Sequence, residues 1–286
     1  MPELPEVETP RQELDKILTG RIIKNVEVLY SKAVFPLSAE VFKKNLLKVK
    51  IENVDRRAKM LFFHLSNNKF LAFHLKMTGQ LIYVPYSGKT VSGDHPTADI
   101  QTPGKHTRLI FTLDDKSHLY FNDLRKFGWS RLLDKNQLDT ATEHYGPEPL
   151  SKNFTPKFLI ELFKQHPKTT IKKSLLDQTL IAGIGNIYAD EACFLARLRP
   201  DRQVGTLTDK DITRLQEQIV AVLKLSIKHK GTSSRNYRRS DGSQGGFVPH
   251  LYVYGRSGDP CKVCGGALVK IKHAGRGTHY CERCQK

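Results

Sequence analysis

Four cysteines near the C-terminus constrain the fold of this chain more than any other feature of its sequence. Cys261 and Cys264 are separated by two residues, as are Cys281 and Cys284, and sixteen residues lie between the two pairs. This spacing is typical of a zinc site in which four thiolates complete a tetrahedral coordination sphere. Such a site leaves no position for water or substrate. We therefore expect one structural zinc ion, holding a β-hairpin that is too short to fold alone.

The chain is strongly basic. It has 46 Lys and Arg residues against 29 Asp and Glu residues, which gives a net charge of +17. This balance indicates a polyanionic partner, most simply nucleic acid. Seven of the basic residues lie in the cysteine segment, residues 255–286. A basic finger that binds nucleic acid fits this composition, and a zinc ribbon that binds protein remains an alternative.

Other features of the sequence bear on the location of the protein. No run of residues approaches the ~18 apolar residues of a membrane helix, and the acidic start has no apolar signal core. Paired cysteines that serve as metal ligands fit a reducing cytosol. The fifth cysteine, Cys193, lies in an expected helix and is interpreted as a core residue. These features predict a cytoplasmic protein.

The first half of the chain is rich in short segments with a strand pattern. They are residues 48–54, 60–65, 70–75, 81–84, 107–113, 118–121 and 129–133. This density of short strands indicates an antiparallel sandwich or barrel. A helix is expected from residue 7 to about 18, with Pro10 kinking or delaying it, and a second helix at 38–47. Residues 85–105 have the composition of a long surface loop.

The second half of the chain is mainly helical. Helices are expected at 156–165, 171–180, 187–198 and 208–229, followed by a strand at 247–254. The predicted organisation is an N-terminal domain at 1–135, a linker at 136–150, a helical domain at 151–254 with a mobile segment at 232–247, and a zinc finger at 255–286.

The first residues, Met1-Pro2-Glu3, could carry covalent chemistry. Removal of Met1 would leave Pro2 with a free secondary amine, which can attack an electrophilic carbon and form an iminium. A terminal amine titrates near pH 7.7–8.0, so part of it is unprotonated at neutral pH. Glu3 could exchange protons beside it. On this stretch alone, the simpler interpretation is an ordinary acidic start to a helix.

A glycine-rich turn precedes Asn186. Its backbone amides and the Asn186 side chain could approach a phosphate at the start of the following helix. A tight turn between two helices would also explain both glycines, Gly183 and Gly185.

Seven motifs occur in one order along the chain. They are MPELPEVET (1–9), RRAK (56–59), HLKMTG (74–79), DLRKFG (123–128), GPEPL (146–150), GIGNIY (183–188) and the cysteine finger. Together they resemble the bacterial formamidopyrimidine-DNA glycosylase family over nearly the whole chain, and Leu4 favours this family over the related endonuclease VIII group. Three departures are Pro10, the length of 85–105 and the lid-like sequence at 233–237.

The resemblance implies an α+β fold. Its parts are an N-terminal antiparallel β-sandwich with flanking helices, a helical domain with a helix–two-turn–helix, and a C-terminal four-cysteine zinc-finger hairpin. It also implies a monomeric base-excision-repair enzyme that acts on double-stranded DNA. Such an enzyme removes oxidised purines through a Schiff base with the sugar and then cleaves the strand by β,δ-elimination.

The resemblance also assigns roles to residues. It makes Pro2 the nucleophile, Glu3 the acid/base partner and Lys59 a contact to the phosphate of the damaged nucleotide. Phosphate contacts are implied for Asn186 and Arg276, and support of the catalytic pocket for Glu6 and Glu191. The further DNA contacts implied are His74, Met77, Arg125, Phe127 and Lys172. Of these, Met77, Arg125 and Phe127 would fill the space that a flipped base vacates.

Simpler interpretations of these residues exist. Met77 and Phe127 could be core residues, Lys59 and Arg276 solvated charges, and Glu6 an ordinary first-turn acid. Two other functions are also consistent with the sequence. One is an oxidised-pyrimidine glycosylase of the endonuclease VIII type, and the other is a non-catalytic zinc-finger DNA-binding protein.

Overall fold

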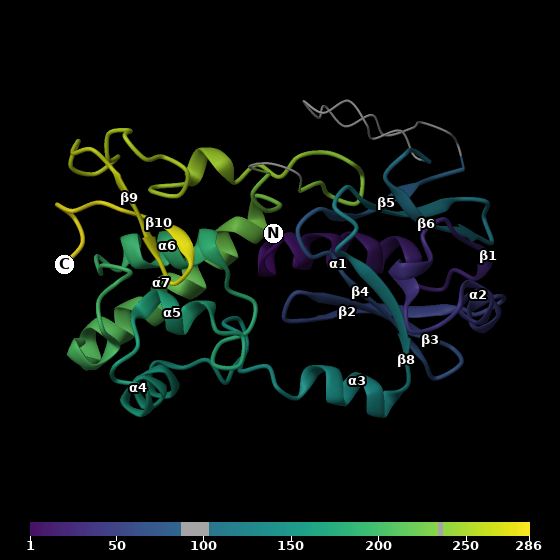
Figure 1. Ribbon diagram of the computed structural model, residues 1–286, viewed down its shortest axis with the longest axis horizontal. Coiled ribbons are helices and arrows are strands. Elements are labelled where there is room, and N and C mark those ends of the chain that lie inside the picture. The colour runs from purple at the N-terminus through teal and green to yellow at the C-terminus, as the bar shows by residue number, and fades with distance from the viewer. Residues whose placement is uncertain (87–102, 234–236) are drawn as a thin grey trace. The chain divides into compact units, whose positions relative to one another are not determined.

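The computed structural model describes residues 1–86, 103–233 and 237–286 (Figure 1). Most of the expected surface loop, residues 87–102, and part of the lid-like stretch, residues 234–236, lie outside the described residues. The chain forms two compact units. The first contains residues 1–143 and 229–248, and the second contains residues 144–228 and 249–286.

The first unit contains two four-stranded antiparallel sheets, as the strand pattern predicts. One sheet has the order β1-β6-β7-β5 and the other β2-β3-β4-β8. The strands are β1 (Ile23–Val28), β2 (Ile51–Arg57), β3 (Met60–Leu65), β4 (Phe70–His74), β5 (Gly79–Val84), β6 (Thr107–Leu113), β7 (His118–Asp123) and β8 (Trp129–Leu133).

Four buried phenylalanines form the centre of the core of this unit. Phe63 and Phe73 come from one sheet, and Phe111 and Phe121 from the other. The centre of the Phe73 ring lies 5.1 Å from that of Phe63, 5.9 Å from that of Phe111 and 5.7 Å from that of Phe121. Tilted and edge-on ring pairs at this spacing are favourable beyond their buried area. The two sheets therefore pack face to face as a sandwich.

Helix α1 (Leu4–Leu18) begins before residue 7 and runs without interruption through Pro10, so the expected delay is wrong. Proline removes one helical hydrogen bond, but tertiary contacts hold the helix on both sides of it. Glu8 Oε2 accepts a bond from Arg56 Nε at 2.9 Å, and Asp15 Oδ1 accepts one from the Val54 amide at 2.8 Å. Both donors lie in β2, so this strand stabilises the helix before and after Pro10.

Three shorter helices complete the first unit. They are η1 (Ser31–Val34), α2 (Ala39–Leu46) and α3 (Lys135–Thr142). Ser38 caps α2, as expected, by accepting a hydrogen bond from the Val41 amide at 3.2 Å. Helix α3 occupies the first half of the segment expected as a linker, residues 136–150. It buries none of its side chains, so its sequence carries no apolar period that would predict it.

The second unit is built on helices. They are α4 (Pro156–Gln165), α5 (Ile171–Leu176), α6 (Asn186–Leu195) and α7 (Asp209–Lys228), with short η2 (Val204–Thr206) and η3 (Val248–His250). Although η3 begins in the first unit at Val248, its other two residues belong to the second. A two-stranded hairpin of β9 (Val269–His273) and β10 (Arg276–Tyr280) completes this unit. None of the helices in the described parts of the chain is long and apolar enough to span a membrane.

The strand expected at 247–254 does not form. Instead, the carboxylate of Glu191 in α6 accepts hydrogen bonds from three consecutive amides, those of Tyr252, Val253 and Tyr254, at 2.8, 2.9 and 2.8 Å. A strand directs successive amides to opposite sides, so one carboxylate cannot collect three of them from a strand. The apolar and aromatic composition that suggested a strand reflects burial of Leu251 and Val253.

Candidate active site

The start of α1 is fixed by Glu6. One oxygen of its carboxylate accepts the Glu3 amide at 3.0 Å, and the other accepts the Thr232 amide at 2.7 Å. Pro2, Glu3 and Glu6 are all buried. A single carboxylate thus joins the residue beside Pro2 to the base of segment 229–248, two places far apart in the sequence. The expected supporting role of Glu6 is consistent with this geometry.

Segment 229–248 is held to α1 at a second point. Glu13 accepts hydrogen bonds from Arg239 Nε at 2.8 Å and from the Ser240 hydroxyl at 2.6 Å. Tyr237 is buried between the two anchors, and burial, with the nearby Glu6 and Glu13 charges, raises the pKa of its hydroxyl well above the usual value. The segment predicted as a lid therefore belongs to the same compact unit as Pro2 and Glu3.

His74 is set up as a neutral hydrogen-bond donor. Its Nδ1 lies 3.0 Å from the Lys76 amide and accepts its hydrogen. Burial, together with the charges of Lys76 and Lys59, lowers the pKa of His74 to about 3. The imidazole therefore carries one proton at neutral pH, on Nε2, because Nδ1 is already an acceptor. A neutral N–H can bind a phosphate oxygen without neutralising its charge. Lys59, itself buried, lies near enough to influence this titration.

Two loops expose apolar side chains at one end of the sandwich. β4 pairs with β8 through His74 and Trp129, and β5 pairs with β7 through Gly79 and Asp123. The connections β4–β5 (residues 75–78) and β7–β8 (residues 124–128) both cross between the two sheets, so the pairing places them side by side. We call them the paired loops.

The three residues expected to fill the space of a flipped base, Met77, Arg125 and Phe127, lie on the paired loops. Met77 is 40% exposed and Phe127 is 54% exposed, which excludes the simpler interpretation that they are core residues. The Arg125 guanidinium lies 4.6 Å from the centre of the Phe127 ring, a cation–π distance. One cationic and two apolar groups therefore project from neighbouring backbone segments.

In the second unit, residues 177–185 form two turns between α5 and α6. The Leu180 and Ile181 amides donate to the Asp177 carbonyl at 3.1 and 2.9 Å. Gln178 braces the second turn, since it accepts the Gly183 amide and donates to the Ile184 carbonyl, each at 2.9 Å. This arrangement is the expected helix–two-turn–helix, and it presents Asn186 at the start of α6.

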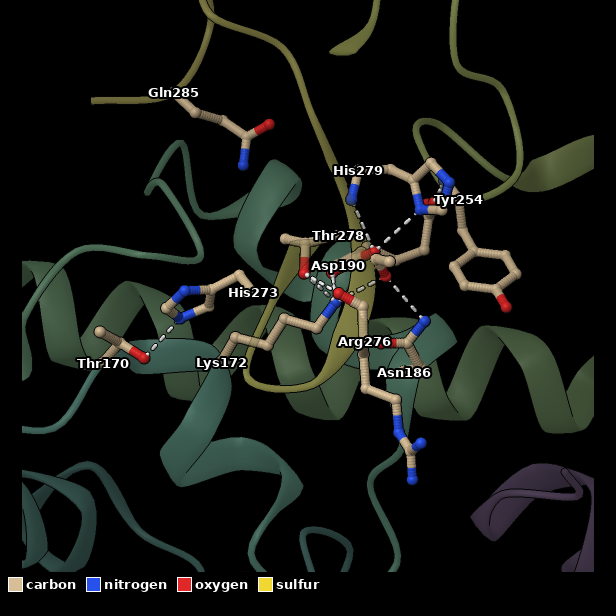
Figure 2. A network of polar contacts seen from close by, with 12 residues as sticks. Thr170, Lys172, Asn186, Asp190, Tyr254, His273, Arg276, Thr278, His279 and Gln285 are labelled. Atoms are coloured by element: carbon tan, nitrogen blue, oxygen red, sulfur yellow. Dashed lines mark hydrogen bonds and ion pairs between the residues drawn. The ribbon is translucent and has the colours of Figure 1, made fainter. Parts of the chain in front are cut away.

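The hairpin of β9 and β10 turns through Ala274 and Gly275, which have φ of 50° and 68°. Two successive left-handed residues make the two-residue turn that suits the twist of a hairpin. His273 pairs with Arg276 across this turn, so Arg276 lies at the tip and is exposed. Asn186 donates to the Gly277 carbonyl at 3.0 Å, which links the hairpin to the start of α6. Figure 2 shows the Arg276 side chain extending away from the surrounding polar network.

Lys172 does not have the position expected of a DNA contact. Its side chain is completely buried. Its ammonium donates to Asp190 Oδ1 at 2.6 Å, to Thr278 Oγ1 at 2.8 Å and to the Gly277 carbonyl at 3.1 Å (Figure 2). Three protein oxygens already surround the ammonium in this arrangement, so the structure shows a structural role for Lys172, and the implied DNA contact stays a prediction. Lys172 fastens the hairpin that carries Arg276.

Glu191 holds a stretch of backbone within the second unit, and its expected support of the catalytic pocket stays a prediction. It belongs to the second unit, and its carboxylate holds the backbone of residues 252–254. Burial raises the pKa of this carboxyl although three amides donate to it. The structure shows Glu191 supporting the segment that leads into the cysteine module.

Sequence reasoning missed Asp190, the partner of Lys172. Its second oxygen accepts the His279 amide at 2.9 Å and lies 3.2 Å from His279 Nδ1. A signal was present, because Asp190 and Glu191 are the two charged residues of α6, which buries most of its length. Adjacent acids in a buried helix predict buried partners, although they do not identify them.

Lys172→Met should lower the free energy of unfolding by about 3–5 kcal/mol, because it leaves the buried Asp190 carboxylate without its cation. Lys173→Met is the matched control. Lys173 is the next residue of α5 and is exposed, so its loss should change stability by less than about 0.5 kcal/mol. Denaturant unfolding of the zinc-loaded protein measures both effects, and equal midpoints would contradict the structural role of Lys172.

The four predicted zinc ligands converge. The sulfur atoms of Cys261, Cys264, Cys281 and Cys284 all lie within 4.8 Å of one another. A tetrahedral site with Zn–S bonds of about 2.3 Å separates its sulfurs by roughly 3.8 Å. The Cys261–Cys284 and Cys264–Cys281 pairs lie 3.9 and 3.5 Å apart, so the cluster fits one zinc ion. Cys193 is buried in α6, as expected.

The predicted site residues divide between the two units. Pro2, Glu3, Glu6, Lys59, His74, Met77, Arg125 and Phe127 lie in the first unit, and Lys172, Asn186, Glu191, Arg276 and the four cysteines lie in the second.

Comparison with known proteins agrees with this architecture. Residues 1–130 match the formamidopyrimidine-DNA glycosylase N-terminal domain, residues 145–238 its H2TH domain, and residues 258–286 a zinc finger found in FPG and IleRS. The chain is 42% identical to formamidopyrimidine-DNA glycosylase of Heliobacterium modesticaldum over 100% of both chains. It is 40% identical to that of Bacillus cereus over 100% of this chain and 99% of the relative.

Solved structures are similar as well. A complex between Lactococcus lactis Fpg and DNA with an abasic site has a TM-score of 0.86 and 36% identity, over 99% of each chain. A complex of the L. lactis protein with FAPY-dG-containing DNA has a TM-score of 0.85 and 35% identity, over 99% of this chain and 100% of that one. From its fold, its four-cysteine cluster and these matches, the chain belongs to the formamidopyrimidine-DNA glycosylase family.

Proposed function

We propose that the protein is a bifunctional DNA glycosylase and abasic-site lyase of base excision repair, with oxidised purines as its substrates. The observation that carries the proposal is the start of α1 in a member of this family. Pro2 directly precedes Glu3, and the Glu3 backbone is fixed by the Glu6 carboxylate. The same carboxylate holds the Thr232 amide, so the proposed nucleophile, its acid/base partner and the base of the lid share one anchor.

The proposed chemistry begins with the amine of Pro2, freed by removal of Met1. Its nitrogen attacks C1′ of the damaged nucleotide as the C1′–N9 bond breaks, and the departing base takes a proton. The sugar ring opens, and the nitrogen and C1′ share an iminium. Loss of a C2′ proton then breaks the C3′–O bond, and a second elimination breaks the C5′–O bond. Glu3 is the group proposed to manage protons beside the sugar.

A damaged base inside a duplex must leave the stack before C1′ can be attacked. The exposed side chains of Met77, Arg125 and Phe127 suit the space that it vacates, since apolar wedges unstack base pairs. Lys59, His74, Asn186 and Arg276 are the proposed contacts to the DNA backbone. Of these, Arg276 is the residue whose position best suits a phosphate contact, because it is exposed at the tip of the β9–β10 hairpin.

Borohydride trapping tests the proposal. Reduction of the iminium should attach the protein covalently to DNA that contains 8-oxoguanine or an abasic site. A form with one extra residue in front of Pro2 is the control, since its nitrogen can no longer form the iminium. A non-catalytic zinc-finger protein would bind the same DNA without becoming attached to it.

The choice of lesion needs a second experiment. L. lactis Fpg is described in complex both with FAPY-dG and with oxidised-pyrimidine DNA, so both lesion classes are tested on this chain. Excision is compared on oligonucleotides with 8-oxoguanine, formamidopyrimidine or an oxidised pyrimidine. Faster release of the pyrimidine would favour the alternative, an enzyme of the endonuclease VIII type. We also propose a cytoplasmic location, where the four thiolates stay reduced for zinc.

Salt dependence distinguishes charged from neutral contacts. The slope of log K against log salt is negative. Lys59→Ala and Arg276→Ala should each make it less steep by about 0.9, the value for one neutralised phosphate. Arg276→Lys is the control that keeps the charge and the slope. His74→Gln should weaken binding without changing the slope, because a His74 pKa of about 3 keeps the imidazole neutral. A change in slope for His74→Gln between pH 6 and 8 would contradict the neutral state.

A further inference from the structure

The paired loops are joined by polar groups beneath their exposed side chains. Thr78, in the first loop, donates its hydroxyl hydrogen to Asp123 Oδ1. Asp123 is the last residue of β7, at the start of the second loop. Asp123 is completely buried and Thr78 is 5% exposed, so solvent does not compete for this bond. The contact connects Met77, the residue before Thr78, to the loop that carries Arg125 and Phe127.

The same carboxylate sets the path of the second loop. Its Oδ2 accepts the Gly128 amide at 2.7 Å, and its Oδ1 accepts the Arg125 amide at 3.2 Å. The Arg125 amide also lies 3.0 Å from the Thr78 hydroxyl oxygen. One side chain thus receives donors from both ends of the 124–128 loop and from the opposite loop. Removing the Asp123 carboxylate would leave the buried Gly128 amide without this acceptor, and an unsatisfied buried donor costs about 1–3 kcal/mol.

Two glycines beside this carboxylate have no room for a side chain. A Cβ atom at Gly128 would lie 2.8 Å from Phe121 Cζ and 3.1 Å from Asp123 Oδ2. A Cβ atom at Gly79 would lie 2.5 Å from the Leu75 carbonyl oxygen. Glycine at both positions therefore lets each loop close tightly onto the polar centre. The backbone next to each exposed residue is therefore restrained at Thr78, at the Arg125 amide and at the Gly128 amide.

We propose that Thr78 and Asp123 are positioning residues that hold Met77, Arg125 and Phe127 as one rigid wedge, so that the energy of DNA binding unstacks the damaged base pair. This inference rests on the proposed function and adds residues that themselves need not touch DNA. Unstacking a base step costs a few kcal/mol. Side chains on mobile loops would fold back or rotate instead of entering the base stack. Side chains on two loops that are hydrogen-bonded to each other keep their position, so that binding energy can be used for unstacking.

Thr78→Val tests the inference, because it removes the hydroxyl group and keeps the shape of the side chain. Its kcat/KM for 8-oxoguanine in a fully paired duplex should fall by about 10–100-fold, the order expected when reacting groups are misplaced by about 1 Å. The fluorescence rise of a 2-aminopurine placed beside the lesion, which reports unstacking, should slow in parallel. Thr78→Ser retains the hydroxyl group and should restore both values.

A second substrate separates positioning from general damage to the protein. When the lesion lies in a bubble of unpaired bases, the stack is already disrupted, so Thr78→Val should approach the wild-type rate. Equal loss on the duplex and the bubble would overturn the inference. So would a wild-type rate on the duplex. Should Thr78→Val fold poorly by circular dichroism, Asp123→Asn gives the same comparison, because its amide places an N–H where the carboxylate accepts one.

Trapping of the wild-type protein keeps the two proposals apart. If borohydride attaches wild-type protein to abasic DNA while Thr78→Val shows no selective loss on the duplex, the catalytic proposal stands and the positioning role fails. If the wild-type protein is never trapped, the proposed function itself fails.

Discussion

Glu3→Gln should slow excision of 8-oxoguanine by about 10²–10⁴-fold, the usual contribution of a positioned acid/base group, and should retain measurable cleavage at a pre-formed abasic site. Release of a purine-like base requires proton transfer while the nucleophile reaches C1′. An abasic sugar has no base to expel, and its ring-opened aldehyde is already electrophilic. Glutamine preserves the size and hydrogen bonding of Glu3 but cannot exchange the proton. Single-turnover assays on the two substrates measure the difference.

The control for Glu3→Gln is a form with one residue added before Pro2, which should fail on both substrates because no iminium forms. The Glu3 amide donates through the backbone to Glu6, so the substitution leaves that anchor in place. Excision by Glu3→Gln at close to the wild-type rate would make Glu3 an ordinary first-turn acid and remove it from the proposed mechanism.

Cys261→Ser should unfold the finger and severely weaken DNA binding. Structural zinc in finger peptides contributes roughly 10–16 kcal/mol of apparent binding energy at pH 7, far more than a small hairpin gains from its own packing. The hairpin carries Arg276 and receives the Lys172 ammonium at Gly277 and Thr278. Loss of the metal should therefore release both. Metal analysis should give one zinc per wild-type chain, and titration with abasic-site DNA measures the loss of affinity.

Cys193→Ala is the matched control for the zinc prediction. Cys193 is buried in α6 and is separate from the four-sulfur cluster. Its replacement should keep one zinc per chain and near-normal binding. Normal DNA binding by Cys261→Ser would mean that the finger is not the proposed contact to the backbone of the DNA.

Much of the fold follows from local sequence patterns. β3, β6 and β8 have the predicted bounds, because their alternating or continuous apolar residues end at clear turns. Helix α4 begins as predicted, with Thr155 accepting the Phe158 amide at 3.1 Å and Pro156 in the first turn. These elements are specified by groups within a few residues of each other, which is the range that sequence patterns describe.

The errors arise where a distant group decides the outcome. Pro10 does not disrupt α1, because β2 braces the helix. Residues 252–254 do not form a strand, because Glu191, some sixty residues earlier, takes their amides. Lys172 has the charge of a DNA contact but is neutralised inside the protein by Asp190. Met77, Phe127 and Arg276, which the resemblance names, are exposed, and their DNA contacts stay predictions. The buried partners that orient such groups became visible only in three dimensions.

The three consecutive amides that donate to the Glu191 carboxylate predict an unusual pattern of hydrogen exchange. Amides are normally protected from solvent deuterium in ladders, where each depends on its own carbonyl acceptor. Those of Tyr252, Val253 and Tyr254 depend on one side chain, so they should become labelled together in a single opening event. A three-residue stretch without regular secondary structure would then report, as one kinetic unit, the loosening of the connection between α6 and the cysteine module.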